Sequence, residues 1–367
     1  MSVDIGIIGL PKSGRTTIFN SLVGAEADTG KYTREGSAHI GTAKVPEPRL
    51  TLLADMIRPA KVVPVSVTYI DIGASVKDMA QDRGIGGQLL TKLSNVDALI
   101  DVVRSFEDDT LPHIAGSLDV ERDIANMNLE LTFSDLALLQ RRLTRIEESL
   151  KGAKPPERSA LQREKELVMK IKESLEEDIP VRELDLTAEE TKALSGYQLL
   201  SAKPLLIVVN IGEEQIPEAE SRAAELDSRY SRKKCRATTI CGELEMEISQ
   251  LDGNAVEELR ADYGIKEPGV DRIIRLSYEL LGLISFFTTA SSELKAWSIQ
   301  SGTDALRAAG KIHSDMERGF IRAEVIGYDD LLKCGSIAEA KKKGLLRLEG
   351  KNYTVQDGDI ITFLFNV

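Results

Sequence analysis

The first residues of the chain constrain its fold more than any other stretch. An apolar run at residues 5–10 is typical of a buried β-strand, and residues 16–23 carry apolar side chains at helical spacing. Between them, Gly9, Gly14 and Thr16 match the phosphate-binding pattern G-x-x-x-x-G-K-[ST], which needs a preceding strand and a following helix. The stretch therefore predicts an α/β protein built around a P-loop.

The chemistry of this loop depends on its backbone and on one side chain. Glycine at two positions allows positive φ angles, so that successive N–H groups can point into one concavity beside a helix N-terminus. Arg15 stands where the pattern has lysine, and its planar fork differs from a compact ammonium. An ordinary glycine turn before a core helix is an equally good explanation of the loop. As phosphate contacts we expect Gly9, Lys12, Ser13, Gly14, Arg15, Thr16 and Thr17.

Length and charge limit the class of protein. The 367 residues suffice for two or three domains, and the net charge of −12 argues against a broadly basic nucleic-acid-binding surface. From residue 283 onward acidic and basic side chains are equal in number, so the whole negative charge precedes that position. Cys235, Cys241 and Cys334 are too scattered for a disulfide framework or a metal site, which favours a reducing cytoplasm. The sequence offers neither a signal peptide nor an apolar run of membrane-spanning length.

A second motif follows a β-branched run. Residues 62–70 predict one strand that ends at Asp71, followed by Ile-Gly-Ala. Nucleotide hydrolases place a carboxylate at such a strand end, where it acts on Mg²⁺ through water, and we expect Thr16 and Asp71 as the metal ligands. A plain strand-end turn fits the segment equally well. The polar residues 24–41 are either a surface loop or a switch segment over the phosphates.

A third motif follows the apolar strand expected at residues 205–209. Guanine-nucleotide proteins carry N-K-x-D at this place, and the chain has Asn210 and, at the fourth position, Glu213. The longer glutamate should disturb the paired hydrogen bonds to guanine and favour adenine or loosen discrimination. As base-side contacts we expect Asn210, Ile211, Glu213, Cys241 and Gly242.

The middle and the end of the chain have patterns of their own. Leucine and isoleucine spacings of three and four on both sides of a Gly/Pro break at residues 152–156 predict two antiparallel helices in a coiled-coil-like hairpin. Residues 283–367 predict a small mixed sheet of the ubiquitin-like kind, with a helix at 337–343.

The order of these motifs resembles the YchF-type Obg-related NTPases of the TRAFAC GTPase class. The motifs that carry the resemblance are Gly9-Leu10-Pro11, Asp71-Ile72, the run 104–109 with His113, Gly116-Ser117-Leu118-Asp119, Asn210-x-x-Glu213, Tyr278-Glu279-Leu280-Leu281, residues 320–325 and residues 351–359. They span nearly the whole chain and are densest in its last hundred residues.

The resemblance implies a fold and an activity. The expected architecture is a P-loop G domain with a mostly parallel sheet (1–127 and 200–282), an inserted helical hairpin (128–199) and a C-terminal β-grasp, or TGS, domain (283–367). Such a protein binds and slowly hydrolyses ATP, often GTP too, and associates with the ribosome. We expect a cytoplasmic monomer that meets the large ribosomal subunit or RNA and neither DNA nor a membrane. Mg²⁺ is the expected cofactor, with K⁺ as a second candidate.

The resemblance also points to a catalytic residue and to departures. In the family a histidine matching His113 is proposed to orient water, since no glutamine follows the Asp71 motif. Arg15 and Ala74 replace the lysine and glycine of the family, and the switch threonine matches only loosely near residues 33–35. Lys12 stands where the family has asparagine and partly restores a compact charge. Two hypotheses follow: a slow ATPase/GTPase that acts as a ribosome-associated switch, or a non-hydrolysing nucleotide- or RNA-binding scaffold.

Overall fold

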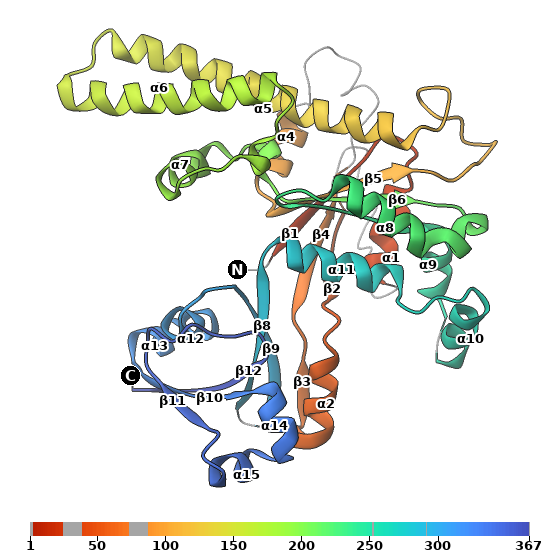
Figure 1. Cartoon of the computed structure of the whole chain (residues 1–367), viewed down its shortest axis with the longest axis vertical. Coiled ribbons are helices and arrows are strands. Elements are labelled where there is room, and N and C mark those ends of the chain that lie inside the picture. The colour runs from red at the N-terminus through yellow and green to blue at the C-terminus, as the bar shows by residue number, and fades with distance from the viewer. Residues whose placement is uncertain (1–2, 25–38, 73–86, 252, 291, 367) are drawn as a thin grey trace. The chain divides into compact units, whose positions relative to one another are not determined.

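The computed structural model describes residues 3–24, 39–72, 87–251, 253–290 and 292–366 (Figure 1). Its chain falls into two compact units. The N-terminal unit comprises residues 4–42 and 68–273, and the C-terminal unit comprises residues 1–3, 43–67 and 274–367. Most of the expected switch segment and all of residues 73–76, which include Ala74, lie outside the described residues. Within the described residues, no helix has the length and apolar character that a bilayer crossing requires.

The N-terminal unit is built on a six-stranded sheet. Its spatial order is β2 (His39–Lys44), β4 (Ser66–Asp71), β1 (Asp4–Ile8), β5 (Ala98–Arg104), β6 (Leu205–Asn210) and β7 (Cys235–Ile240). β4, β1, β5, β6 and β7 pair in parallel, and every residue of β5 and β6 is buried, as in parallel sheets covered on both faces. The predicted, mostly parallel α/β sheet is therefore confirmed. The carboxyl ends of these strands share one edge of the sheet, where the loops after β1, β4, β6 and β7 begin.

The helices of this unit either pack against the sheet or form a separate apolar cluster. They are α1 (Arg15–Val23), α4 (Gly87–Ser94), α5 (Val120–Leu150), α6 (Pro155–Glu176), α7 (Ala188–Leu194), α8 (Ala219–Tyr230), α9 (Gly242–Ile248) and α10 (Asn254–Asp262), with short 3₁₀ turns at Val181–Glu183, Ser195–Tyr197, Leu200–Ala202 and Glu213–Glu218. Leu99 and Val103 of β5 join one core with Ile124 of α5 and Leu244 of α9. α11 (Gly269–Leu280) crosses the boundary between the two units.

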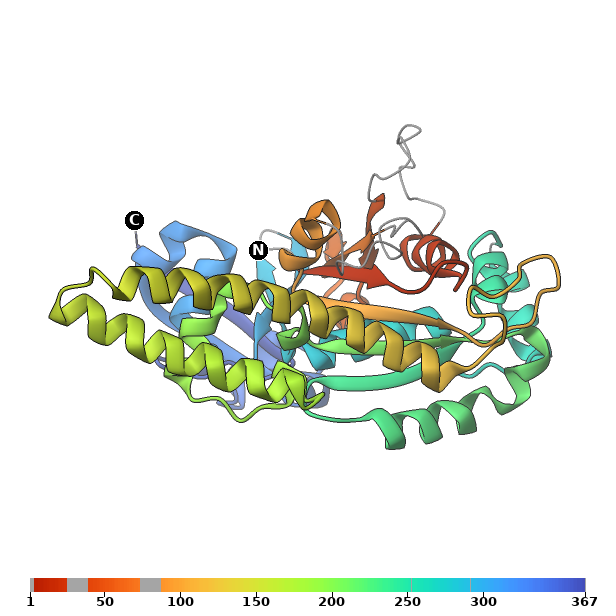
Figure 2. The ribbon, with the colours of Figure 1, turned by 90° about the horizontal axis from the view of Figure 1, so that it is seen from above.

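The helical hairpin consists of α5 and α6, which run antiparallel (Figure 2). Ile146 and Ile171 are fully buried in its seam, and Arg142 forms two hydrogen bonds with the carboxylate of Glu164, at 2.8 and 2.9 Å. α5 begins at Val120, before residue 128, where the hairpin was expected to start. The helix begins earlier because its first part packs in the core of the sheet and its later part forms the hairpin. The predicted inserted hairpin is thus confirmed as part of the fold.

The C-terminal unit has a mixed six-stranded sheet. Its order is β11 (Arg347–Glu349), β10 (Phe320–Gly327), β12 (Asp359–Phe365), β8 (Leu283–Ala290), β9 (Glu293–Gln300) and β3 (Lys61–Val63), with α2 (Pro48–Ile57), α12 (Ala305–Ile312), α13 (Ser314–Arg318), α14 (Tyr328–Cys334) and α15 (Ile337–Lys342). β12 and β8 are parallel, whereas β10–β12 and β8–β9 are antiparallel. This arrangement confirms the predicted β-grasp domain.

Both faces of this sheet are covered. Successive strand residues point to opposite faces, so Phe286 packs with the alanines of α12 while Phe287 packs with Leu50 and Leu53 of α2. The sequence pattern did not predict α12, whose buried side chains are the small Ala305, Ala308 and Ala309. Its signal was Asp304, whose carboxylate accepts a hydrogen bond from the Arg307 N–H at 2.8 Å.

The prediction of one strand over residues 62–70 is wrong. The structure divides the run into β3 and β4, which belong to different sheets. Pro64 lies between them, and proline has no N–H to donate to a strand ladder. The chain therefore changes units here, and residues 43–67, expected within the G domain, group with the C-terminal residues. The four-part domain division remains a prediction.

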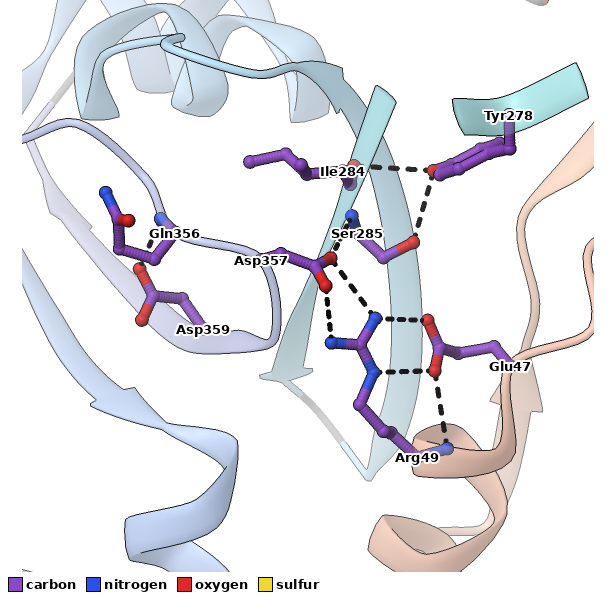
Figure 3. A network of polar contacts seen from close by, with 8 residues as sticks. All are labelled: Glu47, Arg49, Tyr278, Ile284, Ser285, Gln356, Asp357 and Asp359. Atoms are coloured by element: carbon purple, nitrogen blue, oxygen red, sulfur yellow. Dashed lines mark hydrogen bonds and ion pairs between the residues drawn. The ribbon is translucent and has the colours of Figure 1, made fainter. Parts of the chain in front are cut away.

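A polar network fixes α2 in the C-terminal unit (Figure 3). The guanidinium of Arg49 lies between two carboxylates and donates two hydrogen bonds of 2.7 Å to Glu47 and one of 2.8 Å to Asp357. Asp357 also accepts the Ser285 N–H at 2.9 Å. The network therefore joins the start of α2 to β8 and to the turn before β12.

Candidate functional site

The loop between β1 and α1 has the conformation that the glycine pattern predicts. Lys12 and Gly14 have φ angles of 68° and 85°, and the Ser13 N–H donates to the Leu10 carbonyl at 3.2 Å. The first hydrogen bond of α1 runs from the Ile18 N–H to the Gly14 carbonyl at 3.0 Å. The N–H groups of residues 15–17 therefore have no acceptor inside the helix, which suits an anion at this end.

Asn210 joins three loops through one side-chain amide. Its Nδ2 donates to the Ser13 carbonyl at 3.0 Å, and its Oδ1 accepts the Gly242 N–H at 3.0 Å. The side chain is buried at the end of β6, so the loops after β1, β6 and β7 are held together. A Cβ atom on Gly14 would lie only 2.2 Å from Asn210 Nδ2, which explains glycine at that position.

Arg15 points across the loop to the end of β4. Its Nε donates to Asp71 Oδ1 at 2.6 Å, and its Nη1 donates to the Gly9 carbonyl at 3.3 Å. The Thr16 hydroxyl donates to the other carboxylate oxygen, Oδ2, at 2.8 Å. The side chains of Arg15 and Asp71 are only 14% and 5% exposed, so this ion pair is shielded from water.

These loops line a cavity of about 1060 Å³. Its lining residues are Leu10, Lys12, Ser13, Gly14, Arg15, Thr16, Thr17, Phe106, Glu107, Asp108, Leu111, Asn210, Ile211, Gly212, Glu213, Glu214, Glu243, Met246, Glu247 and Gln250. The cations Lys12 and Arg15 come from the glycine loop, whereas most of the carboxylates follow β6 or lie on α9. The cavity is large enough for a nucleotide, with its cationic end at the N-terminus of α1.

Gly9, Cys241 and Gly242 support the cavity without lining it. Gly9 accepts the Arg15 guanidinium through its carbonyl, and Gly242 donates its N–H to Asn210. Cys241 caps α9 and lines a neighbouring pocket of about 330 Å³. Burial raises the pKa of the Cys241 thiol to about 11, so the thiol is protonated and unreactive near neutral pH.

Glu213 begins the 3₁₀ turn after β6 and lines the cavity. Its Oε2 accepts a hydrogen bond from the Tyr263 hydroxyl at 3.2 Å. Ile211, two residues earlier, is buried and donates its N–H to the Ile240 carbonyl at 2.8 Å. The carboxylate is thus held at the cavity wall by an aromatic hydroxyl.

His113 lies away from the cavity. Its Nε2 is 2.9 Å from Asp123 Oδ2, and its Nδ1 accepts the Ala115 N–H at 3.1 Å. The side chain is only 5% exposed, and it lines a small separate pocket together with Ser13 and Asp101. A catalytic role for His113 therefore requires the 105–118 loop to move.

Arg104 is an organising residue that the sequence did not single out. It ends β5, and its guanidinium donates to the carbonyls of Phe106 at 3.1 Å and Leu111 at 2.6 Å while lying 4.5 Å from the Phe106 ring centre. Arg104 is only 4% exposed, although it belongs to the charged run 104–109. The available signal was an arginine at the end of a strand whose other residues, apart from Asp101, are apolar.

Thr16 and Asp71 offer the oxygen donors that a hard divalent cation prefers. The donor set fits Mg²⁺ in kind, but Arg15 already engages one carboxylate oxygen and Thr16 the other. Elsewhere in the described ranges no group of three or more His, Cys, Asp or Glu side chains is placed to hold a metal. A divalent cation at Asp71 would therefore compete with Arg15 for this carboxylate.

The sheet order, the glycine loop at the N-terminus of α1 and the cross-linking asparagine define a P-loop protein of the nucleotide-hydrolase fold class. The comparisons specify the family. Residues 283–366 match YchF-GTPase_C, described as "Protein of unknown function (DUF933)". The "Ribosome-binding ATPase YchF" of Bacillus subtilis (strain 168) is 38% identical, and that of Escherichia coli O157:H7 is 34% identical, each over 100% of both chains.

A solved structure agrees with these sequences. The Schizosaccharomyces pombe YchF GTPase superposes with a TM-score of 0.83 at 25% identity, covering 99% of this chain and 98% of that one. The chain therefore belongs to the YchF family, which confirms the resemblance drawn from the motifs.

Proposed function

We propose that this chain is a ribosome-associated nucleotide-binding protein. It binds ATP, and it also binds GTP because it discriminates weakly between the two bases. It hydrolyses the bound nucleotide slowly. The observation that carries the proposal is the cavity of about 1060 Å³, which is lined by the glycine loop after β1 and by Asn210 and Glu213 at the end of β6. Relatives of full length are named ribosome-binding ATPases. Phosphates bind the amides of the glycine loop, and the base lies toward the loops after β6 and β7.

Base preference follows from Glu213 in this proposal. The carboxylate is one methylene longer than the aspartate of guanine-specific proteins, and the Tyr263 hydroxyl already occupies one of its oxygens. Such a group matches the two adjacent donors of guanine poorly, which costs affinity for that base. ATP is therefore the preferred nucleotide.

For hydrolysis we propose Mg²⁺ on Thr16 and Asp71, K⁺ as a further activating cation, and His113 as the residue that orients water. His113 must first leave Asp123, which makes loop movement part of the reaction. Slow turnover is consistent with that requirement, because an infrequent conformational step limits the rate.

The alternative function is a non-hydrolysing scaffold. It is favoured by the ion pair of Arg15 with Asp71, which occupies the groups that hydrolysis requires. In both versions we propose the large ribosomal subunit or its RNA as the partner, a cytoplasmic location, a monomer, and the four-part domain division expected from the sequence.

Two measurements on the full chain test the proposal. Cosedimentation with ribosomes should depend on ATP, and multiple-turnover phosphate release in K⁺ buffer should exceed the buffer background. His113→Ala should lower phosphate release by about a hundredfold, within the usual effect of a proton-transfer residue. His313→Ala, which changes an exposed histidine of the C-terminal unit, is the matched control. Background release with intact ATP binding would support the scaffold, and failure to bind either ATP or ribosomes would refute the proposal.

A further inference from the structure

We infer that Arg15 competes with a divalent cation for Asp71, so that this chain binds nucleotide almost equally well with and without the cation. The inference rests on the proposed nucleotide binding and concerns which positive groups neutralise the phosphates at that site. Arg15 replaces the lysine of the P-loop pattern and is therefore a particular feature of this sequence.

Both carboxylate oxygens of Asp71 already accept hydrogen bonds from protein groups. Oδ1 receives Arg15 Nε at 2.6 Å, and Oδ2 receives the Thr16 hydroxyl at 2.8 Å. The Arg15 Nη1 also donates to the Gly9 carbonyl at 3.3 Å, so the guanidinium spans the glycine loop from its first residue to the end of β4. Both groups that would ligate a cation are thus bonded to the protein itself.

The chemistry of arginine makes this arrangement specific. Nε and Nη1 lie in one rigid plane and can bond a carboxylate and a carbonyl together, whereas a lysine ammonium is a point charge on a flexible stem. The pair is at most 14% exposed, where opposite charges attract more strongly than in bulk water. A divalent cation at Asp71 must break this pair and also lies close to a displaced positive charge, so the two occupants exclude each other.

Phosphate still finds donors when Arg15 stays in place. Arg15 Nη2 makes no hydrogen bond with the residues that the structure describes, and Lys12 lines the same cavity with an exposed side chain. The amides of residues 15–17 face the same end of the cavity. The phosphates can therefore be neutralised by protein groups where a cation would ordinarily contribute.

The test is a fluorescence titration of the full chain with a fluorescent ATP analogue, in excess Mg²⁺ and in EDTA. The wild-type dissociation constant should change by less than about threefold between the two buffers, whereas Arg15→Lys should bind about tenfold more tightly in Mg²⁺, as expected when one charge-assisted contact is restored. Arg222→Lys is the matched control, because Arg222 bonds Ser105 and not Asp71, and it should behave like the wild type.

Two further readouts separate the possible outcomes. Asp71→Asn removes the acidic partner of the Arg15 ion pair and should leave nucleotide binding insensitive to Mg²⁺. In a second measurement, electron paramagnetic resonance should detect less Mn²⁺ bound to the nucleotide complex of the wild type than to that of Arg15→Lys. Wild-type binding that requires Mg²⁺ as strongly as Arg15→Lys overturns the inference and leaves the proposed function intact. If no variant binds the analogue in either buffer, the proposed function fails and the inference fails with it.

Discussion

At the scale of single residues, the site depends on hydrogen bonds and close contacts that need one particular side chain, and not only a side chain of similar size or charge. Asn210 uses both ends of its amide, Gly14 leaves space for that amide, and Arg15 reaches a carboxylate 56 positions away. The sequence predicted Asn210 and Gly14 as site residues from motif spacing. It could not predict the Arg15–Asp71 pair, because side-chain direction depends on how β1 and β4 align.

Gly14→Ala should destabilise the protein and weaken its nucleotide affinity. A left-handed φ in a non-glycine residue costs about 1–2 kcal/mol, and the new methyl group also displaces the Asn210 amide. Gly116→Ala is the matched control, since Gly116 has a similar φ of 80° with nothing described within 4 Å. Urea unfolding of both variants measures the difference, and equal losses would contradict the role of Asn210.

Asp101 should make stability depend on pH. Burial, assisted by Asp123, raises the pKa of this carboxyl to about 8, whereas an exposed aspartate in the unfolded chain titrates near 3.8. The folded state then binds the extra proton, so the free energy of unfolding falls as pH rises from about 4 to about 8. Asp101→Asn, which stays neutral, should lose much of this decline in urea unfolding at pH 5.5 and 8.5. An unchanged pH dependence would exclude the assignment.

At the scale of elements, the periodic patterns predicted what local packing controls. The hairpin, the β1–α1 connection and strand β6 followed from apolar spacing and glycine or proline breaks. The division of residues 62–70 between two sheets did not, because periodicity shows that a strand forms but not which sheet receives it. α12 was missed because its buried face is made of alanine, which gives a weak apolar signal.

Ile171→Ala should loosen the hairpin while leaving nucleotide affinity unchanged. Ile171 is fully buried between α5 and α6, and such a truncation costs about 2–5 kcal/mol. Hydrogen exchange of α6 should rise in this variant and not in Met169→Ala, whose side chain is 42% exposed. A parallel loss of nucleotide affinity would show that the hairpin and the cavity are not independent.

Arg49→Ala should release α2 from its sheet. The change removes four hydrogen bonds to Glu47 and Asp357 and leaves the carboxylate of Glu47, only 10% exposed, without its cation. We expect a loss of about 1–3 kcal/mol. Lys61→Ala removes an exposed 3.9 Å ion pair of the same unit and should cost less than about 1 kcal/mol. Thermal unfolding of both variants compares them, and equal shifts would refute the proposed importance of the network.

At the scale of the whole molecule, the YchF relatives match this chain over nearly its whole length. The family could be predicted from sequence because its short motifs recur in a fixed order. The replacement of the P-loop lysine by Arg15 is visible in the sequence. Its consequence depends on the ion pair of Arg15 with Asp71, which only the structure shows.

Calorimetric titration of ATP into the full chain tests the central claim most directly. The account predicts binding at one site per chain, weakened about tenfold by Asn210→Ala, which unlinks the three loops of the cavity, and unchanged by Gly116→Ala. The absence of any binding of ATP or GTP to the wild-type chain, in Mg²⁺ and in EDTA, would contradict it.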